Sequence, residues 1–211
     1  MRRILRDKFR LGLFDDPYVD PDAAVELVGA PDGRALGREV QRRSVVHLAG
    51  GPRTATRLYV EGIDPAVAAG YGTVVADPEL AELAVVRLAT PYERREGMLE
   101  QHFHSGSLEF DPAEVERLTA LAAAVPTAFA AQLERPAVLT PLAPHAALLI
   151  GEFGAADEVV LDAALGRAPM TGTLPFDLPA SDAAVAASRE DVPFDTAAPL
   201  FRHGHRATGG S

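Results

Sequence analysis

Five side chains with carboxyl or imidazole groups fall at residues 93–104 of one segment, which runs from residue 89 to about residue 110. They are Glu93, Glu96, Glu100, His102 and His104. Carboxyl and imidazole groups are the usual proton donors and acceptors of enzymes. A carboxylic acid held against apolar neighbours keeps its proton more strongly, which suits it to donate that proton to a reacting group. The same composition also fits a solvated acidic loop, so the segment alone leaves both interpretations open.

Two histidine pairs have a spacing that metal ligands also use. They are His102-x-His104 and His203-x-His205. A zinc site needs three or four convergent ligands, and an isolated pair of this kind is common in loops. We therefore expect no metal site.

A glycine-containing turn at residues 151–154 reads GEFG and precedes a predicted helix. Backbone N–H groups at such a turn can cradle a phosphate. The segment lacks both the lysine of a phosphate-binding loop and the full dinucleotide spacing, so we expect no nucleotide cofactor. Asp157 and Glu158 fall in the first turn of the helix, where negative charge is favourable, and we expect a structural role for them.

Composition limits the class of protein. The chain has 211 residues, 47% hydrophobic residues and a formal net charge of -10. The apolar content suffices for one core-forming domain, and the negative charge disfavours nucleic acid and anionic membranes as partners. The absence of cysteine excludes disulfides and thiolate metal ligands. The first residues lack the apolar centre of a secretory signal, and no apolar run reaches the ~20 residues of a membrane span, so we expect a cytoplasmic protein.

Short apolar runs predict the strands of a mostly parallel sheet, because continuous runs are typical of strands covered on both faces. The runs occupy residues 44–48, 57–60, 73–76, 84–88, 127–131 and 147–150. Helices are expected at about 65–70, 78–83, 112–124 and 155–165. This alternation predicts a three-layer α/β sandwich with helices on both faces of the sheet.

Asp-Pro pairs predict where helices begin, at Asp20, Asp64, Asp77 and Asp111. The aspartate accepts bonds from unpaired N–H groups of the first turn, and proline at the first helical position loses no bond. Glu114 lies three residues after Asp111 and completes a capping-box pattern. Four residues of the helix that follows have helical spacing and should face the sheet: Val115, Leu118, Leu121 and Ala122.

We expect three parts along the chain. Residues 1–43 form a helical connector arm, residues 44–205 form the α/β domain with a short helix near 181–188, and residues 206–211 form a disordered tail. Ligands of open parallel sheets bind outside the carboxyl ends of the strands. The segment with the five ionisable side chains is the longest one that leaves such an end.

Three stretches resemble glycoside hydrolase family 3. Residues 165–176 read LGRAPMTGTLPF, similar to the carboxy-terminal domain of that family. Residues 3–20 read RILRDKFRLGLFDDPYVD, similar to the connector that follows its catalytic barrel. Residues 90–110 read TPYERREGMLEQHFHSGSLEF and resemble a bacterial subgroup with a glutamate shortly before an FHxGSL stretch. The resemblance extends over essentially all of residues 3–205.

This resemblance implies a β-glucosidase-like enzyme that hydrolyses terminal β-linked sugars with retention. In the family, the second domain often supplies the general acid/base from this loop. Carried over, the candidate is Glu100, with Glu96 and His102 as fallback candidates. The Gly-Asp-Arg or Gly-Asp-Asn that follows the acid in better-known members is replaced here by Ser-Gly-Ser at residues 105–107.

The nucleophile and most of the sugar site belong, in that family, to the amino-terminal barrel, which this chain does not resemble. We therefore expect the chain alone to be inactive, with a β-glycoside or oligosaccharide substrate shared with a barrel domain on another chain. We expect Asp15 and Asp16 to form a turn before Pro17, not a catalytic pair of carboxylates. An arm separated from its barrel should expose apolar side chains and favour a homo-oligomer. The candidates for this surface are Leu11, Leu13, Phe14 and Tyr18.

Two other functions remain open from the sequence. One is a non-catalytic carbohydrate-binding or assembly module, or a truncated inactive copy of the enzyme. The other, ranked last, is a receiver-type phosphoacceptor domain. That chemistry needs clustered acids and a basic residue at the strand ends, whereas the one lysine, Lys8, lies in the arm.

Overall fold

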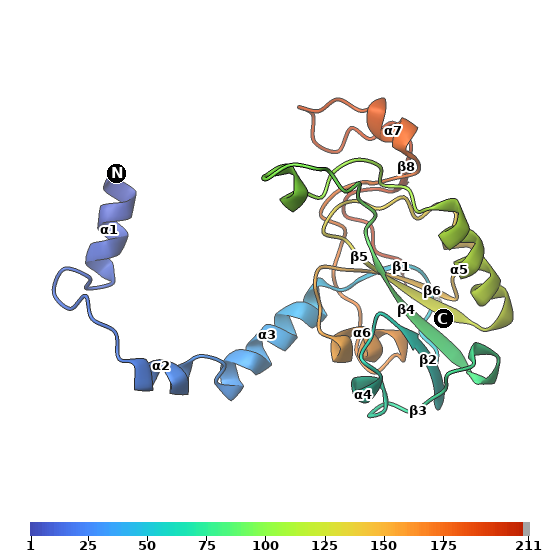
Figure 1. Ribbon diagram of the computed structural model, residues 1–211, viewed down its shortest axis with the longest axis horizontal. Helices are drawn as coiled ribbons and strands as arrows, with labels where there is room; N and C mark the ends of the chain where they lie inside the picture. Colours follow the sequence, from blue (N-terminus) through green and yellow to red (C-terminus); the bar gives the residue numbers. More distant parts are fainter. Residues whose placement is uncertain (209–211) are drawn as a thin grey trace. The chain divides into compact units, whose positions relative to one another are not determined.

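The computed structural model describes residues 1–208. It divides into two compact units, Met1–Gly37 and Arg38–Ser211 (Figure 1). The boundary falls inside α3 (Pro31–Ser44), earlier than the expected end of the arm at residue 43. Over the described residues, no helix combines the length and the apolar composition that crossing a membrane requires.

The first unit is helical and has no core of its own. It contains α1 (Arg2–Arg10), α2 (Pro21–Leu27) and the beginning of α3, and within residues 1–208 none of these helices buries a residue. The four apolar side chains expected to form an exposed surface are indeed exposed, by 42% to 86%: Leu11, Leu13, Phe14 and Tyr18.

The second unit is built on a six-stranded sheet in the order β1-β6-β5-β4-β2-β3. All neighbouring strands are parallel except β1 and β6, which are antiparallel. The strands lie where the apolar runs predict them: β1 (Val46–Gly50), β2 (Arg57–Glu61), β3 (Thr73–Val74), β4 (Leu83–Ala89), β5 (Thr127–Gln132) and β6 (Leu148–Glu152).

Helices cover both faces of the sheet, which confirms the predicted three-layer sandwich (Figure 1). On one face, α4 (Pro65–Ala68) and α6 (Asp157–Ala164) pack in one apolar cluster. On the other face, α5 (Pro112–Ala124) packs in a second cluster through its predicted apolar stripe. Leu118 and Leu121 of this stripe are buried.

The Asp-Pro pairs begin helical turns as predicted, since each aspartate accepts a backbone N–H bond at the start of α2, α4, η1 (Pro78–Leu80) and α5. The prediction of a capping box is wrong, however. Glu114 does not turn back to Asp111 but accepts bonds from Arg117 at 2.7 and 2.8 Å.

The helix expected at 78–83 is also wrong, because the chain makes only the single 3-10 turn η1 there. Ala81 is already extended, with φ -81° and ψ 153°, and Leu83 begins β4. The Glu82 carboxylate accepts from the N–H of Thr56 at 2.7 Å. This bond draws the segment toward β2 and away from a helical path.

The last part of the chain adds α7 (Asp182–Ala186), near the expected position, and a two-stranded sheet of β7 (Leu178–Pro179) and β8 (Pro199–Phe201). Part of the tail expected to be disordered is held in place. Arg206 donates to the Thr171 carbonyl at 2.9 Å, and the Ala207 N–H donates to the His47 carbonyl at 2.8 Å. Residues 209–211 lie outside the described residues.

Replacing Leu118 by alanine should lower the free energy of unfolding by about 2–5 kcal/mol, because a fully buried side chain is removed between α5 and the sheet. Urea unfolding followed by circular dichroism measures the change. Leu99→Ala is the matched control, since Leu99 is 67% exposed and its loss should change stability by less than about 0.5 kcal/mol. Equal midpoints for the two variants would contradict this packing.

Candidate functional site

The candidate site lies on the loop that joins β4 to α5, residues 90–111, at the carboxyl edge of the sheet (Figure 1). The two limbs of this loop run side by side near its base. Glu93 N–H donates to the Ser105 carbonyl at 2.8 Å, forming an isolated antiparallel bridge. The loop therefore has a paired stem, and residues 94–104 project beyond it.

Arg135 fastens both limbs of the stem. Its Nη1 donates to the Pro91 carbonyl at 3.0 Å and its Nη2 to the Gly106 carbonyl at 2.7 Å. Thr90 adds a bond from its hydroxyl to the Gln132 carbonyl at 2.6 Å. The segment after β5 thus anchors a loop that leaves β4.

A second anchor comes from α7. The Asp182 carboxylate accepts from the Ser107 hydroxyl at 2.6 Å and from the Leu108 N–H at 2.9 Å. Asp182 N–H in turn donates to the Glu109 carboxylate at 3.0 Å. Charged acceptors of this kind make the stronger class of hydrogen bonds, so the returning limb is firmly positioned.

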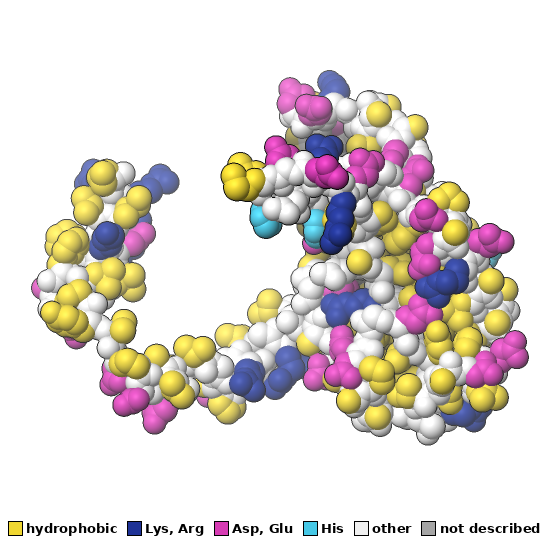
Figure 2. All heavy atoms as spheres, viewed as in Figure 1, with side chains coloured by type: hydrophobic (Ala, Val, Ile, Leu, Met, Phe, Trp, Pro, Cys, Tyr) yellow, Lys and Arg dark blue, Asp and Glu magenta, His cyan; other side chains and the backbone are white. Residues whose placement is uncertain are grey.

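Glu100, the candidate acid, lies at the far end of the loop in the short turn η2 (Glu100–His102). Met98, Leu99 and Phe103 around it are 83%, 67% and 65% exposed. Figure 2 shows hydrophobic side chains gathered at this projecting end. Gly97 has φ +144°, a backbone conformation that residues with a side chain rarely adopt, and glycine therefore allows the tight turn before Glu100.

The other predicted candidates separate into tip and stem. Glu96 and His102 are exposed near the tip, as is Glu100. Glu93 belongs to the stem, because its carboxylate accepts from the Ser107 N–H at 3.2 Å. Five surface cavities among residues 1–208 have linings that contain none of Glu96, Glu100 and His102.

The histidines of each pair do not converge. His104 stacks on Tyr92 with ring centroids 3.8 Å apart and contacts the Glu134 carboxylate, whereas His102 is an exposed residue at the end of η2. His205 donates to the Leu48 carbonyl at 2.9 Å, and His203 stacks on Phe194. Across residues 1–208 no cluster of three His, Asp or Glu side chains could hold a metal ion.

A buried ion cluster occupies the GEFG turn. Arg87 donates to Glu152 and to Asp157, both at 2.9 Å. The second Glu152 oxygen accepts from the N–H groups of Gly154 at 2.6 Å and Ala155 at 2.7 Å. Because the carboxylate takes the N–H groups that a phosphate would need, the turn is not a phosphate cradle. Asp157 has the predicted structural role.

A charged network that was not predicted from the sequence lies at the base of the loop. Arg117 donates to both oxygens of Glu61 at 2.9 Å, and the Tyr59 hydroxyl donates to Glu61 at 2.8 Å. The Arg117 guanidinium holds the pKa of Glu61 below its ordinary range, and the bond to Glu61 raises the pKa of Tyr59. The i,i+3 spacing of Glu114 and Arg117 on an expected helix was a signal in the sequence that could have indicated part of this network.

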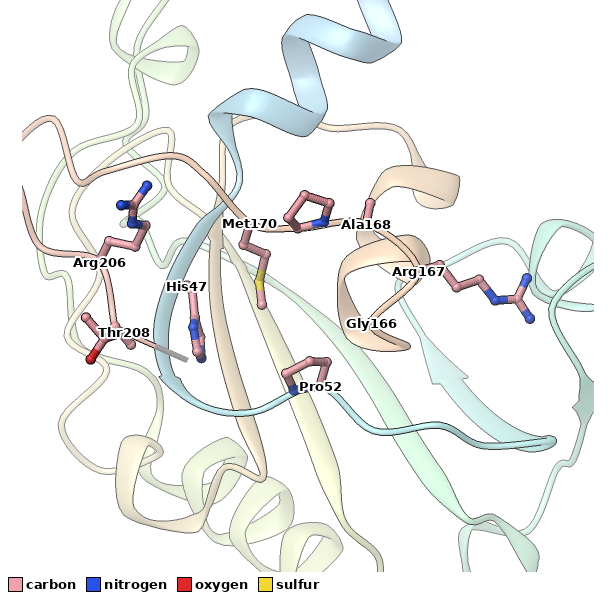
Figure 3. Close-up of a pocket in the computed structure, with 10 residues that line it drawn as sticks. His47, Pro52, Gly166, Arg167, Ala168, Met170, Arg206 and Thr208 are labelled. Carbon is pink, nitrogen blue, oxygen red and sulfur yellow. The ribbon is translucent and has the colours of Figure 1, made fainter. Parts of the chain in front are cut away.

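This network lines a cavity of about 480 Å³ between the ends of β2 and β4. A larger cavity of about 630 Å³ lies beside β1, where His47, Pro52 and Met170 point into the same space (Figure 3). Arg167 points away from that space and lies over the Tyr71 ring, 4.5 Å from its centroid. The larger cavity has no residue of the candidate loop in its lining.

No protein-family model matches the chain. It is 42% identical over 212 aligned positions to beta-glucosidase C of Emericella nidulans, an alignment that covers 96% of this chain and 34% of the relative. It is 36% identical over 214 positions to a periplasmic beta-glucosidase/beta-xylosidase of Dickeya chrysanthemi, covering 97% of this chain and 33% of that protein. The chain is a homologue of family 3 β-glucosidases. It spans about a third of the length of these curated relatives.

Solved structures share the fold of this β-glucosidase homologue. The β-glucosidase of Listeria innocua, in complex with isofagomine, superposes with a TM-score of 0.75 at 15% identity, over 97% of this chain and 38% of that one. A β-glucosidase of Erythrobacter marinus superposes with a TM-score of 0.76 at 17% identity, over 97% and 39%. The arrangement of helices and strands is therefore that of one part of larger β-glucosidases.

Glu61→Gln should destabilise the homologue at neutral pH and have little effect in acid. Because Arg117 lowers the Glu61 pKa from its ordinary value of 4.5, the ionised carboxylate contributes stability above that value, and this stability is lost as the pH falls through the lowered pKa. Urea unfolding at pH ~7 and at pH ~3 measures the change. Glu116→Gln, an exposed change next to Arg117 on α5, should show no such pH dependence. A Glu61→Gln effect that is constant with pH would contradict the ion pair.

Proposed function

We propose that this chain is the carboxy-terminal domain of a family 3 glycoside hydrolase and contributes to the hydrolysis of terminal β-linked glycosides. Its 42% identity with beta-glucosidase C over 96% of its own length supports this assignment. The remaining two thirds of that relative have no counterpart here. In the proposal, an amino-terminal barrel on another chain or segment completes the enzyme.

Within that enzyme, Glu100 is the general acid/base. It protonates the oxygen of the departing group in the first step and removes a proton from the attacking water in the second, as retaining hydrolysis requires. The observation that carries this role is the position of Glu100 at the end of a projecting loop, with its stem fastened by Arg135 and by Asp182. An acid held in this way is suited to a site completed by a second domain.

The nucleophile comes from the barrel in this proposal. A retaining glycosidase places its two carboxyl groups about 5–5.5 Å apart, and Glu100 is absent from the linings of the five cavities described above. The exposed Met98, Leu99 and Phe103 support the same arrangement, because on docking they would shield the acid from water and strengthen its interaction with the reacting oxygen.

The helices of Met1–Gly37 fit the role of a connector. They bury no residue in the described part of the chain and expose a run of apolar side chains. Apolar surface of this kind is typical of a protein–protein contact. We assign that contact to the barrel; in its absence the same surface favours a homo-oligomer.

The chain by itself should not hydrolyse an aryl β-glucoside, because a retaining reaction needs the second carboxylate. Release of 4-nitrophenol from its β-glucoside by the purified chain measures this. A preparation from cells that lack the chain, made in parallel, controls for contaminating enzyme. Turnover that purifies with the chain and is absent from this control would refute the two-domain requirement.

A chimera tests the role of Glu100. In it, this chain replaces the aligned third of beta-glucosidase C. Glu100→Gln should lower kcat/KM on cellobiose by ~100-fold or more, since this ratio reports the first step and general acid catalysis contributes about that much. The loss in kcat/KM should be far smaller for an activated aryl glycoside, whose departing group needs no proton.

Glu96→Gln and His102→Ala are the matched controls in the same chimera. Each should keep kcat/KM within a few-fold of the unaltered chimera on both substrates. If Glu96→Gln instead gave the substrate-dependent loss, the acid would be Glu96. If no variant did so, the loop would have only a binding or structural role.

A further inference from the structure

We propose that the crevice between the carboxyl ends of β2 and β4 binds a neutral saccharide, at a site separate from Glu100. It is formed by the ends of two strands, the base of the β4–α5 loop and the first turns of α5. Glu100 lies at the opposite end of that loop and is absent from the lining. The inference does not depend on hydrolysis by this chain.

The strand order places the crevice where this kind of sheet opens. From β2 the chain moves outward to β3, then returns across β2 to β4 and continues through β5 to β6. The segments that leave β2 and β4 lead to α4 and α5, which pack on opposite faces of the sheet. Open α/β sheets bind their ligands at such a switch point, outside the carboxyl ends of the strands.

The space at this point is large enough for a small ligand. Its volume of about 480 Å³ lies within the ~300–1,000 Å³ of typical small-molecule sites. Gly62, with φ +68°, helps to shape the floor, because a Cβ there would lie 2.8 Å from the Arg87 carbonyl oxygen. Glycine lets the end of β2 approach β4 closely and keeps this part of the lining free of a side chain.

The polar side of the crevice is already held in one conformation. Arg117 binds Glu61 through two bonds of 2.9 Å and Glu114 through bonds of 2.7 and 2.8 Å. These contacts use four of the five guanidinium N–H groups and leave one donor. Glu61 and Glu114 both retain unused lone pairs, so the network presents fixed acceptors and a donor without the entropy cost of ordering side chains.

Charge and apolar contacts indicate which ligand fits. Both arginines of the lining, Arg87 and Arg117, are paired with carboxylates, which leaves no uncompensated cation among the lining residues to attract a phosphate or carboxylate. The lining also includes the aromatic residues Tyr92 and Phe110. Hydroxyl groups can donate to the two carboxylates while C–H groups pack on the rings. A polyhydroxylated neutral molecule, a saccharide, meets both requirements.

The test is a titration of the intact chain with cellobiose, followed by ¹H–¹⁵N NMR. Using Glu100→Gln chain in parallel removes any consumption of the ligand. Saturable shifts are expected in residues 59–62, 86–92 and 110–117, and inorganic phosphate should not produce them. Shifts confined to residues 96–103, binding of phosphate in place of cellobiose, or no saturable shift would each overturn the proposal.

Two variants locate the site. Tyr92→Ala removes a ring and Ala89→Phe fills the space from an exposed position at the end of β4, and each should weaken binding by about tenfold. Tyr18→Ala is the control, because Tyr18 is an exposed ring in the first unit. Thermal melts establish that each variant is folded. Unchanged affinity in both folded crevice variants would place the ligand elsewhere and overturn the proposal. If the chimera were inactive while the chain still bound cellobiose at the crevice, only the proposed hydrolytic role would be contradicted.

Discussion

A buried ion cluster at the carboxyl edge of the sheet holds together the elements that form both candidate sites. Arg87 extends from β4 to Glu152 at the end of β6, so this pair spans the strand β5 between them. Glu152 is 0% exposed, and a charge so placed is tolerable only because an arginine and two backbone N–H groups compensate it. Asp157 continues the cluster to the N–H of Asp64, before α4. The strand ends therefore keep fixed positions, from which the long loop departs.

That fixed edge allows one loop to have two different regions. Its base is tied to the segment after β5 by Arg135 and to α7 by Asp182, and it contributes Tyr92 to the crevice. In the described chain, the hydrogen bonds of residues 94–103 at its tip are local turns, and this tip exposes apolar side chains beside Glu100. Few buried contacts at the tip and many at the base mean that the tip can adjust to a partner while the base stays in place.

Much of the fold could be predicted because its signals are local. Apolar runs marked the strands, and aspartates such as Asp20 and Asp111 marked helix starts, since a cap depends on the next two or three residues. At residues 78–83 the start of the helical turn was predicted but its length was not. The bond of Glu82 to Thr56, which draws the chain into β4 after a single turn, joins residues 26 positions apart.

The site was less predictable than the fold, because most of its contacts join residues that are far apart in the sequence. The loop could be found from its length and its position after a strand. Its anchors could not, since Arg135 lies 44 positions from Pro91 and Asp182 lies 75 from Ser107. The pairing of Glu61 with Arg117, 56 positions apart, also depends on two elements meeting in three dimensions. Side-chain identity alone carries no such information.

Neither border of the sheet presents a long open edge for strand addition. β1, at one border, is paired on its outer side with Gly172, and the N–H of Ala207 binds the His47 carbonyl. A Cβ at residue 172 would lie 2.5 Å from the Ser44 carbonyl oxygen, so only glycine permits this approach. β3, at the other border, has two residues. Exposed strand edges are templates for aggregation, and covering one while shortening the other protects the domain from joining its neighbours into fibrils.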